Sequence, residues 1–218
     1  MRRVPAQQQK KEQTRAKLVE AALRVFALQG YDHATVEEIA LAAGYSKGAY
    51  YFHFDSKEAI FLELLSMWIE EQTRRLELYG TASEPPAVAL LSTIESLLRY
   101  DNRDPHWRSL LPEFWAQAHR NDRVCSALRK AYDRWLELLQ AVFDSAARQR
   151  LLPLAVSSPV AAGLVLAAHD GLIVHRQLRP SREKEPPLTQ TLAALMSTLT
   201  VAPTRVAMAQ PRAVKRAR

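Results

Sequence analysis

The sequence predicts an all-α protein, with an N-terminal three-helix helix-turn-helix head joined by a long helix to a C-terminal helical bundle. Three observations indicate this fold class. Apolar residues recur at steps of three and four in most segments of the 218-residue chain, which is the period of an amphipathic helix. Good helix-capping residues stand before several of these segments. The chain holds only 6 glycines, too few for a loop-rich β architecture.

The first two helices are expected at 13–28 and 36–43. Over 13–28 the apolar residues follow the helical period, and Gly30 suits the end of the helix because glycine adopts a positive φ without steric cost. Thr35 and Glu38 have the spacing of a capping box, in which each side chain bonds a free amide of the other residue. The second helix is therefore expected to begin directly after Thr35.

A tight corner is predicted between the second helix and a third one at about 47–53. Gly44 can take the positive φ that a sharp turn needs, and Ser46 is a good N-cap residue for the next helix. Ala40 is small where the helices cross, and Tyr50 is expected to close the core beneath the turn. Two short helices joined in this way form a helix-turn-helix.

A long fourth helix is expected to connect the head to the rest of the chain. Asp55 and Glu58 have the spacing of a second capping box, and the apolar residues that follow, up to Trp68, lie on one side of a helix. The segment 80–86 contains a glycine and two prolines, which cannot continue a helix, and is interpreted as a linker. Further helical patterns follow at 87–100, 107–119, 122–150, 158–178 and 187–201.

The C-terminal helical patterns differ in how many of their faces are apolar. The segments 161–174 and 188–199 are apolar on more than one face, which either an interface between subunits or a core within one chain would explain. The segment 122–150 instead carries one stripe at alternating steps of four and three, made of Val124, Leu128, Ala131, Trp135, Leu138 and Val142.

The net charge of +7 is concentrated at the two ends of the chain. Residues 1–17 hold six basic residues against one acidic residue, and residues 203–218 hold five basic residues and no acidic one. The stretch between them has a net charge of −3. The front end suits an arm that binds a polyanion, and the tail is either a solvated part of such a pattern or an ordinary disordered end.

The composition excludes several classes of protein. The single cysteine, Cys125, rules out an intrachain disulfide and a multi-cysteine metal site. No window approaches ~18 consecutive apolar residues and the N-terminus is polar, so we expect a cytoplasmic protein with no membrane partner and no signal peptide. His169 and His175 have a poor spacing for a shared metal ion, and we expect neither a metal site nor a cofactor.

The corner and the helices beside it resemble a known family. At 35–40 (TVEEIA) and 44–58 (GYSKGAYYFHFDSKE) the chain resembles the tetracycline-repressor (TetR/AcrR) family of bacterial transcription regulators. The stretches 114–118 (FWAQA) and 169–172 (HDGL) are similar to the body of betaine-responsive and related repressors. The resemblance implies a sequence-specific DNA-binding regulator, most often a repressor that a small-molecule effector releases from a palindromic operator, and a homodimer formed through the last two helices.

The resemblance also implies that residues 46–52 form a recognition helix that enters the major groove. Lys47 suits a phosphate or a guanine edge, Gly48 allows close approach to the DNA backbone, and the helix that Thr35 caps would present its free amides to a phosphate. Three aromatic residues are instead expected to fill the core of the head: Tyr50, Phe52 and Phe54. The expected DNA contacts are Thr35, Tyr45, Ser46, Lys47, Gly48, Ala49, Tyr51, His53 and Lys57.

Within that set the expected contacts are of two kinds. Tyr45, Ala49 and Tyr51 offer aromatic or methyl surface to thymine methyls and phosphates. His53 and Lys57 are expected at phosphates, as matching positions are in the family.

The sequence leaves two other classes of function open. A helical enzyme is disfavoured because adjacent residues on a helix, such as His169 and Asp170, do not face each other, and because no HExxH, Walker or GxSxG motif is present. A ligand-independent architectural DNA-binding protein would need no cavity, whereas the body is rich in aromatic residues, some of which are expected to line one. The residues expected there are Trp68, Trp107, Phe114, Trp115, His119, Trp135, His169 and Leu172.

These expectations divide the chain into four parts. Residues 1–12 form a basic flexible arm, and residues 13–60 form the helix-turn-helix DNA-binding domain. Residues 61–202 form the helical ligand-binding and dimerisation domain, and residues 203–218 form a basic disordered tail. In the expected mechanism, ligand-driven repacking near Trp68 tilts the long helix, so that the two heads of the dimer no longer match the spacing of their DNA sites.

Overall fold

The computed structural model describes residues 6–80, 105–149 and 153–178, together with residues 194, 195, 197 and 199. Within these residues the chain is all-α, as the sequence predicted. The helices are α1 (Ala6–Gln29), α2 (Val36–Ala42), α3 (Lys47–His53), α4 (Lys57–Gly80), α6 (Pro105–Ala118), α7 (Asp122–Arg148) and α8 (Ser158–Leu178). The helix predicted at 87–100 lies outside the described residues, and the one at 187–201 is represented by four residues in helical conformation.

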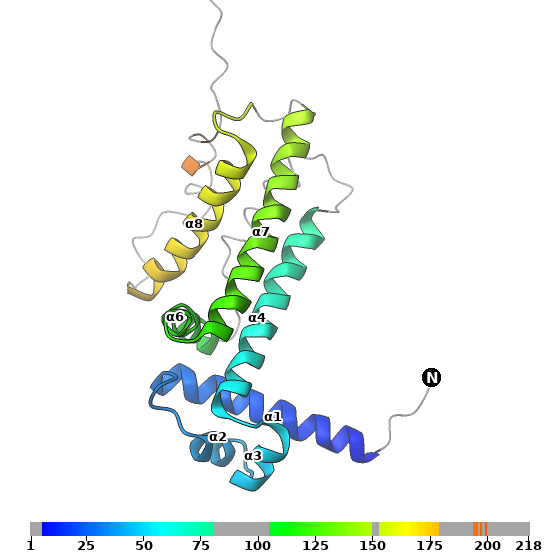
Figure 1. The fold of residues 1–218 in the computed structure, drawn as a ribbon, viewed down its shortest axis with the longest axis vertical. Coiled ribbons are helices and arrows are strands. Elements are labelled where there is room, and N and C mark those ends of the chain that lie inside the picture. Colours follow the sequence, from blue (N-terminus) through cyan, green and yellow to red (C-terminus); the bar gives the residue numbers. More distant parts are fainter. Residues whose placement is uncertain are drawn as a thin grey trace, which may run out of the picture.

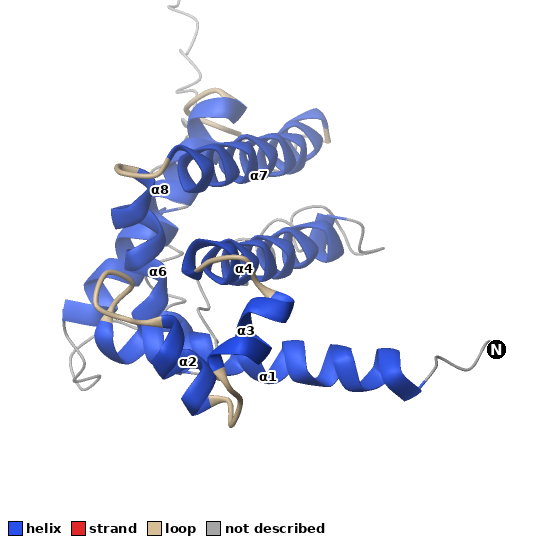
Figure 2. Cartoon of the chain, turned by 60° about the horizontal axis from the view of Figure 1, so that its bottom comes forward, coloured by secondary structure: helices blue, strands red, loops and turns tan. Residues whose placement is uncertain are grey.

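The head lies at one end of the molecule and the helices of the body rise from it (Figure 1). α2 and α3 lie beneath α1, and α4 leads from the head to a position beside α7. α7 packs against both α4 and α8, while α6 contacts α1, α7 and α8. Figure 2 shows the N-terminal half of α1 extending past α2 and α3. The long helix that joins head and body is therefore α4, as predicted.

The core of the head forms where α1 packs on α2 and α4. Phe26 of α1 meets Phe61 of α4 edge to face, with ring centroids 5.5 Å apart, and Tyr31 meets the same ring at 4.4 Å. Tyr50 of α3 is fully buried, and its hydroxyl donates to the Ser56 carbonyl at 2.9 Å. The buried side of α3 is thus tied to the start of α4.

Aromatic contacts continue from the head into the body without a break. The ring of Phe61 lies 5.1 Å from that of Phe114 on α6, and Phe114 stacks on Trp68 at 5.9 Å. Trp68 in turn meets Trp135 of α7 edge to face at 5.4 Å. We call Phe26, Phe61, Phe114, Trp68 and Trp135 the aromatic chain, and all five side chains are buried. Head and body therefore share one hydrophobic core, which crosses the boundary expected between residues 60 and 61.

The first helix begins earlier than predicted. α1 starts at Ala6 and not at residue 13, so residues 6–12 of the expected flexible arm are helical. Glutamine, lysine and glutamate fill most of this stretch, and all three are good helix formers that need no apolar face to adopt helical backbone. The amphipathic pattern therefore marked only the packed part of the helix.

The capping group of α4 also differs from the prediction. The Ser56 hydroxyl accepts the Ala59 N–H at 3.1 Å, which places the cap one residue after Asp55. Glu58, expected to close a capping box, instead accepts a hydrogen bond from the Asn121 amide at 3.0 Å. The start of α4 is thus held against the loop between α6 and α7, which no local pattern in the sequence specifies.

The buried face of α7 follows the predicted stripe only over its first half. Leu138 and Val142 of that stripe are partly buried, and the fully buried positions move on by one residue. The prediction used a strict repeat of 3.5 residues, whereas a straight helix has 3.6 residues per turn, so the face drifts by about 20° per heptad. The buried residues of α7 are Val124, Leu128, Ala131, Trp135, Leu139, Phe143 and Ala146.

Candidate nucleic-acid interface

Capping groups fix the corner between α2 and α3. The Thr35 hydroxyl accepts the Glu38 N–H at 3.2 Å, and the Glu38 carboxylate accepts the Thr35 N–H at 2.9 Å, so the predicted capping box is present. Gly44 has a φ of 77°, and the Ser46 hydroxyl accepts the Ala49 N–H at 3.2 Å. Hydrogen bonds from the Thr35 side chain and backbone hold the pKa of Glu38 below its ordinary value. The predicted helix-turn-helix is therefore confirmed, and Thr35 has a capping role within it.

α3 turns most of its surface outward. Of its seven residues only Tyr50 is buried, whereas Lys47 and Gly48 are exposed and Tyr51 is 46% exposed. The Lys47 ammonium forms an ion pair with Glu37 of α2 and lies 5.9 Å from the centroid of the Tyr51 ring. The hydrogen bond between the two charges raises the pKa of Lys47 and lowers the pKa of Glu37. The side chains predicted to contact DNA from α3 are thus accessible to a partner.

The fold itself gives no reason for a glycine at position 48. A Cβ placed on Gly48 would meet only the Ser46 hydroxyl oxygen, at 3.8 Å, which is an ordinary contact. Its φ is not positive, unlike those of Gly30 and Gly44. Since a glycine within a helix costs about 1 kcal/mol relative to alanine, the missing side chain points to a surface outside the chain that comes close to α3.

Tyr45 and His53 are half-buried between α3 and α1. The Thr14 hydroxyl of α1 lies within hydrogen-bond distance of the Tyr45 hydroxyl, at 3.4 Å. The Nδ1 atom of His53 is buried and has no hydrogen-bond partner among the described residues. Burial, followed by the positive charges of Lys11 and Arg15, lowers the pKa of His53. This edge of α3 is therefore electropositive.

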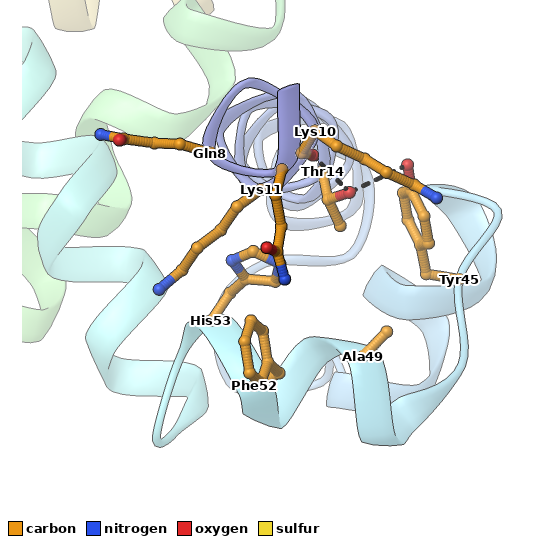
Figure 3. Close-up of a pocket in the computed structure, with 9 residues that line it drawn as sticks. Gln8, Lys10, Lys11, Thr14, Tyr45, Ala49, Phe52 and His53 are labelled. Atoms are coloured by element: carbon orange, nitrogen blue, oxygen red, sulfur yellow. Dashed lines mark hydrogen bonds between the residues drawn. The ribbon is translucent and has the colours of Figure 1, made fainter. Parts of the chain in front are cut away.

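A hollow of about 780 Å³ lies between the first turns of α1 and α3, and we call it the α1–α3 hollow (Figure 3). Phe52, which we expected in the core, stands at this hollow and is 70% exposed. That expectation was wrong because Phe52 is two residues from Tyr50, about 200° round a helix, and therefore points away from the buried side. The residues of the hollow are Gln7, Gln8, Lys10, Lys11, Thr14, Tyr45, Ala49, Phe52 and His53.

Lys57, which was expected at a phosphate, makes its contacts within the chain in this structure. Its ammonium donates to the carbonyls of Tyr31 at 2.7 Å and Ala34 at 2.9 Å, and it lies 3.3 Å from the carbonyl of Asp32. The same ammonium is 4.5 Å from the centroid of the Tyr31 ring. An ammonium has three N–H donors, so these carbonyls use all of them. Lys57 thus joins the start of α4 to the loop between α1 and α2.

The loop between α1 and α2 is also held by α6, and we call these contacts the head–α6 joint. The Glu113 carboxylate accepts the Tyr31 N–H at 3.1 Å, and the Gln117 amide donates to the Asp32 carboxylate at 3.1 Å. Arg120 pairs with the same carboxylate at 3.5 Å. The partners are between 82 and 88 residues apart in sequence, so no local pattern could have indicated them. The joint couples the position of the head to the position of α6.

Two of the residues expected to line a ligand cavity lie together at a hollow in the body. Trp68 and Trp107 stand at a hollow of about 390 Å³, which we call the body hollow. The indole N–H of Trp68 is buried and has no partner among the described residues. The other lining residues are Met67, Glu70, Glu71, Gln72 and Arg74, which combine apolar and charged side chains.

The other expected cavity residues do not converge on the body hollow. Phe114 and Trp135 are fully packed in the shared core, and Leu172 packs against that core while partly exposed. His119 is exposed at the end of α6. The indole of Trp115 donates to the Tyr132 hydroxyl at 3.0 Å, on the side of α6 that meets α7.

His169 takes part in a polar network that joins α7 and α8. The Tyr132 hydroxyl donates to the Asp170 carboxylate at 2.7 Å, and burial together with that carboxylate raises the pKa of Tyr132. His169 Nδ1 lies 3.1 Å from the other oxygen of Asp170. Our expectation that His169 and Asp170 do not face each other was therefore wrong. Adjacent positions are about 100° apart round a helix, so both can lie on its inner side, and here Tyr132 draws the carboxylate there.

Among the residues that the structure describes, no group of three or more histidine, cysteine, aspartate or glutamate side chains is placed to hold a metal ion. No described helix has the length and apolar character needed to cross a membrane.

Comparisons with known proteins agree with this geometry. Residues 18–64 match the model described as bacterial regulatory proteins, tetR family, and residues 86–201 match the model described as BetI-type transcriptional repressor, C-terminal. A curated relative, the HTH-type transcriptional regulator SrpR of Pseudomonas putida, is 28% identical over 169 residues, or 74% of each chain. The HTH-type transcriptional repressor AcnR of Corynebacterium glutamicum is 35% identical over 139 residues, 63% of this chain and 64% of that one.

Solved structures have the same fold. A TetR transcription regulator from Haloarcula marismortui superposes with a TM-score of 0.75 at 18% identity, over 87% of this chain and 100% of that one. A transcriptional regulator from Rhodococcus superposes with a TM-score of 0.70 at 25% identity, over 85% of this chain and 95% of that one. The helical arrangement around the corner is thus shared with structures of low sequence identity.

Proposed function

Because this chain belongs to the TetR family of bacterial regulatory proteins and is a DNA-binding transcriptional regulator, we propose that it is a repressor that binds a palindromic operator as a homodimer and is released by a small-molecule effector. The observation that carries the proposal is the exposed side of α3. This helix presents Lys47, Gly48 and Tyr51 to solvent. Its N-terminal end is capped by Ser46, and the buried Tyr50 anchors it to the core of the head.

In this proposal α3 lies in the major groove, and each of its exposed residues contacts a different part of the DNA. Lys47 exchanges its ion pair with Glu37 for a phosphate or a guanine edge, and Gly48 lets the helix approach closely. Tyr51 and Tyr45 offer ring surface to thymine methyls and phosphates. Ser46 caps the end of the helix nearest the bases, and Ala49 faces the same groove. His53 contacts a phosphate from the far end of α3.

An apolar stripe on α8 supports the homodimer. Its positions are separated by steps of 4, 3, 4 and 3 residues, which place them along one side of the helix. Val160, Leu164 and Val174 are 49%, 45% and 42% exposed, so a substantial apolar surface is uncovered in one chain. A second copy of α8, together with the helix that the sequence predicts at 187–201, would cover this surface. The stripe consists of Val160, Leu164, Ala167, Gly171 and Val174.

The placement of α6 supports release by a ligand. One end of α6 carries Trp107, which lines the body hollow, and the other end carries Glu113 and Gln117 of the head–α6 joint. A molecule that enters the hollow beside Trp68 and Trp107 would shift α6 and, through the joint, the head. DNA half-sites repeat at about 34–36 Å or a multiple of it, so a small change in the separation of two heads weakens binding.

Selection of DNA fragments tests the DNA-binding part of the proposal. The wild-type chain, Tyr51→Ala and Tyr51→Phe are each bound to a random duplex library at two salt concentrations. We expect the wild type to enrich a palindrome, Tyr51→Ala to lose that enrichment, and Tyr51→Phe to keep most of it because the ring is retained. Binding that is indifferent to sequence and to the substitution would refute the assignment of α3 as the recognition helix.

A separate measurement tests the effector. A small-molecule library is screened for compounds that raise the melting temperature, since a ligand that binds only the folded state stabilises it. The operator affinity is then measured with and without each stabilising compound, in the wild type and in Trp107→Ala. We expect at least one compound to weaken operator binding by roughly 5- to 150-fold, and Trp107→Ala to need more of it. Stabilising compounds that leave operator affinity unchanged would favour a ligand-independent architectural protein.

A further inference from the structure

The first turns of α1 bury none of their own side chains within the described part of the chain. Burial in α1 starts at Leu18, whereas every side chain from Gln7 to Gln13 is exposed. A helix of mixed polar residues gains little stability by itself, because most helical stability in proteins comes from packing. The two views of the molecule agree that this part of α1 extends beyond α2 and α3 (Figures 1 and 2). This part of α1 is therefore free to meet a surface outside the chain.

The α1–α3 hollow faces that surface with cationic and amide groups. Lys10 and Lys11 lie at its rim, and neither forms an ion pair in the described residues, whereas the nearby Arg15 is bound to Glu63 at 2.6 Å. The Lys11 ammonium lies 5.2 Å from the centroid of the exposed Phe52 ring (Figure 3). His53 adds a buried nitrogen without a partner. These groups match an anion that also carries apolar surface, as a sugar–phosphate backbone does.

The position of the hollow identifies which part of a DNA duplex would reach it. Phe52 and Ala49 line the hollow and belong to α3, so the hollow is continuous with the proposed recognition surface. In both views the free end of α1 points to the side of the molecule opposite α8. If α8 lies at the dimer axis, the first turns of α1 lie on the outer side of each head, over the ends of the operator.

We propose that the α1–α3 hollow binds the sugar–phosphate backbone of the DNA that flanks each half-site, with Lys10 and Lys11 on successive phosphates. The eight residues from Gln7 to Thr14 span about 10 Å of helix, which is enough for two phosphates of one strand at 3.4 Å of axial rise each. Phe52 packs against the sugars between them, and a phosphate oxygen supplies the partner that His53 lacks. The inference rests on the proposed function, because it assumes that α3 binds DNA.

The test uses the full-length chain and two duplexes, one trimmed to the selected palindrome and one extended by several base pairs on each side. The variants are Lys10→Ala/Lys11→Ala and the charge-conserving Lys10→Arg/Lys11→Arg. A matched control, Arg129→Ala/Lys130→Ala, removes two exposed charges from α7. Equal melting temperatures establish that all variants are folded. The affinity of the wild type and of each variant for each of the two duplexes is measured over a range of salt concentrations.

We expect Lys10→Ala/Lys11→Ala to weaken binding to the extended duplex. The plot of the logarithm of the association constant against the logarithm of the salt concentration should become less steep by about 1.8 per head, since each phosphate contact contributes about 0.9. The arginine pair and the α7 control should keep the wild-type slope, and the palindrome should remain the preferred sequence. An unchanged slope on the extended duplex, or an equal loss on both duplexes, would overturn the inference. Either result would leave the proposed function standing, because that function depends on Tyr51 and not on the lysines.

Discussion

At the scale of single residues, Gly48 is a position where a substitution should affect folding stability and DNA binding in opposite directions. A Cβ at this position meets nothing closer than 3.8 Å inside the chain, so Gly48→Ala should stabilise the folded state by roughly 0.5–1 kcal/mol. The same methyl group would stand between α3 and the DNA, and we expect operator affinity to fall roughly tenfold or more. Chemical denaturation and operator titration check the two effects. A stabilised variant with full operator affinity would show that nothing approaches α3 at this point.

The second prediction for a single residue concerns His53 and the dependence of folding stability on pH. Burial and the charges of Lys11 and Arg15 hold its pKa below the ordinary value of 6.5, so the unfolded state takes up a proton before the folded state does. The stability that neutral His53 contributes is therefore complete above about pH 6.5 and is lost as the pH falls through its folded pKa. We expect His53→Gln to reduce the fall in melting temperature between pH 7 and pH 5.

The control for that prediction is His33→Gln, which removes an exposed histidine from the same head. It should leave the pH dependence of the melting temperature as it is in the wild type. If His53→Gln follows the wild-type curve as closely as His33→Gln does, the half-buried imidazole of His53 has no influence on stability in this range.

Local signals in the sequence allowed the roles of single residues in the corner to be predicted. Contacts between distant segments could not be predicted in this way. Thr35, Gly44 and Ser46 act as expected because a cap or a turn depends on residues within three or four positions. Lys57 was expected at a phosphate, but its ammonium bonds to carbonyls 23 to 26 residues away. Phe52 was assigned to the core by its residue type, although its position relative to Tyr50 turns it outward.

At the scale of helices, the proposed mechanism makes α6 the connection between the body hollow and the head. Removing the head–α6 joint in Glu113→Ala/Gln117→Ala leaves the Tyr31 N–H and the Asp32 carboxylate without these partners. We expect a loss of about 1–3 kcal/mol in stability. We also expect the effector to bind nearly as well while changing operator affinity several-fold less than in the wild type. Urea denaturation and operator titration with the screened compound measure these quantities.

An exposed ion pair on α7 provides the control for the joint. Arg134 lies 3.8 Å from Glu137, both are largely exposed, and such pairs contribute little to stability. Glu137→Ala should therefore change neither the stability nor the response to the compound. A joint variant with a normal response would mean that α6 does not carry the signal to the head.

The helices themselves could be predicted more completely than their ends and faces. The apolar period and the capping residues located α2 and α3 within a residue or two, because both features are local. The start of α1 was missed by seven residues, since its first turns have no apolar face. On α7, Leu139 and Phe143 are fully buried instead of Leu138 and Val142, because a straight helix has 3.6 residues per turn and its packed face drifts away from a strict 3.5-residue repeat.

At the scale of the whole molecule, the proposed dimer makes the clearest prediction. Leu164 is the second of the five residues in the apolar stripe of α8 and is 45% exposed, and Leu164→Glu would place a charge in the proposed interface of both copies. We expect the dimer Kd to rise at least 100-fold, or about 2.7 kcal/mol, as measured by equilibrium sedimentation. Leu41→Glu is the matched control, because Leu41 is 79% exposed on α2, away from α8. A dimer equally stable in both variants would place the interface elsewhere.

The aromatic chain limits which parts of this protein can be exchanged with those of a relative. A new pairing of signal and target gene could be made by grafting the head of one regulator onto the body of another. Here Phe61 and Phe114 meet at 5.1 Å across the expected boundary, so a graft at residue 60 would bring together two surfaces that were never selected to fit. A chimera of this protein should carry α1 to the middle of α4 and the facing part of α6 as a single transplanted unit.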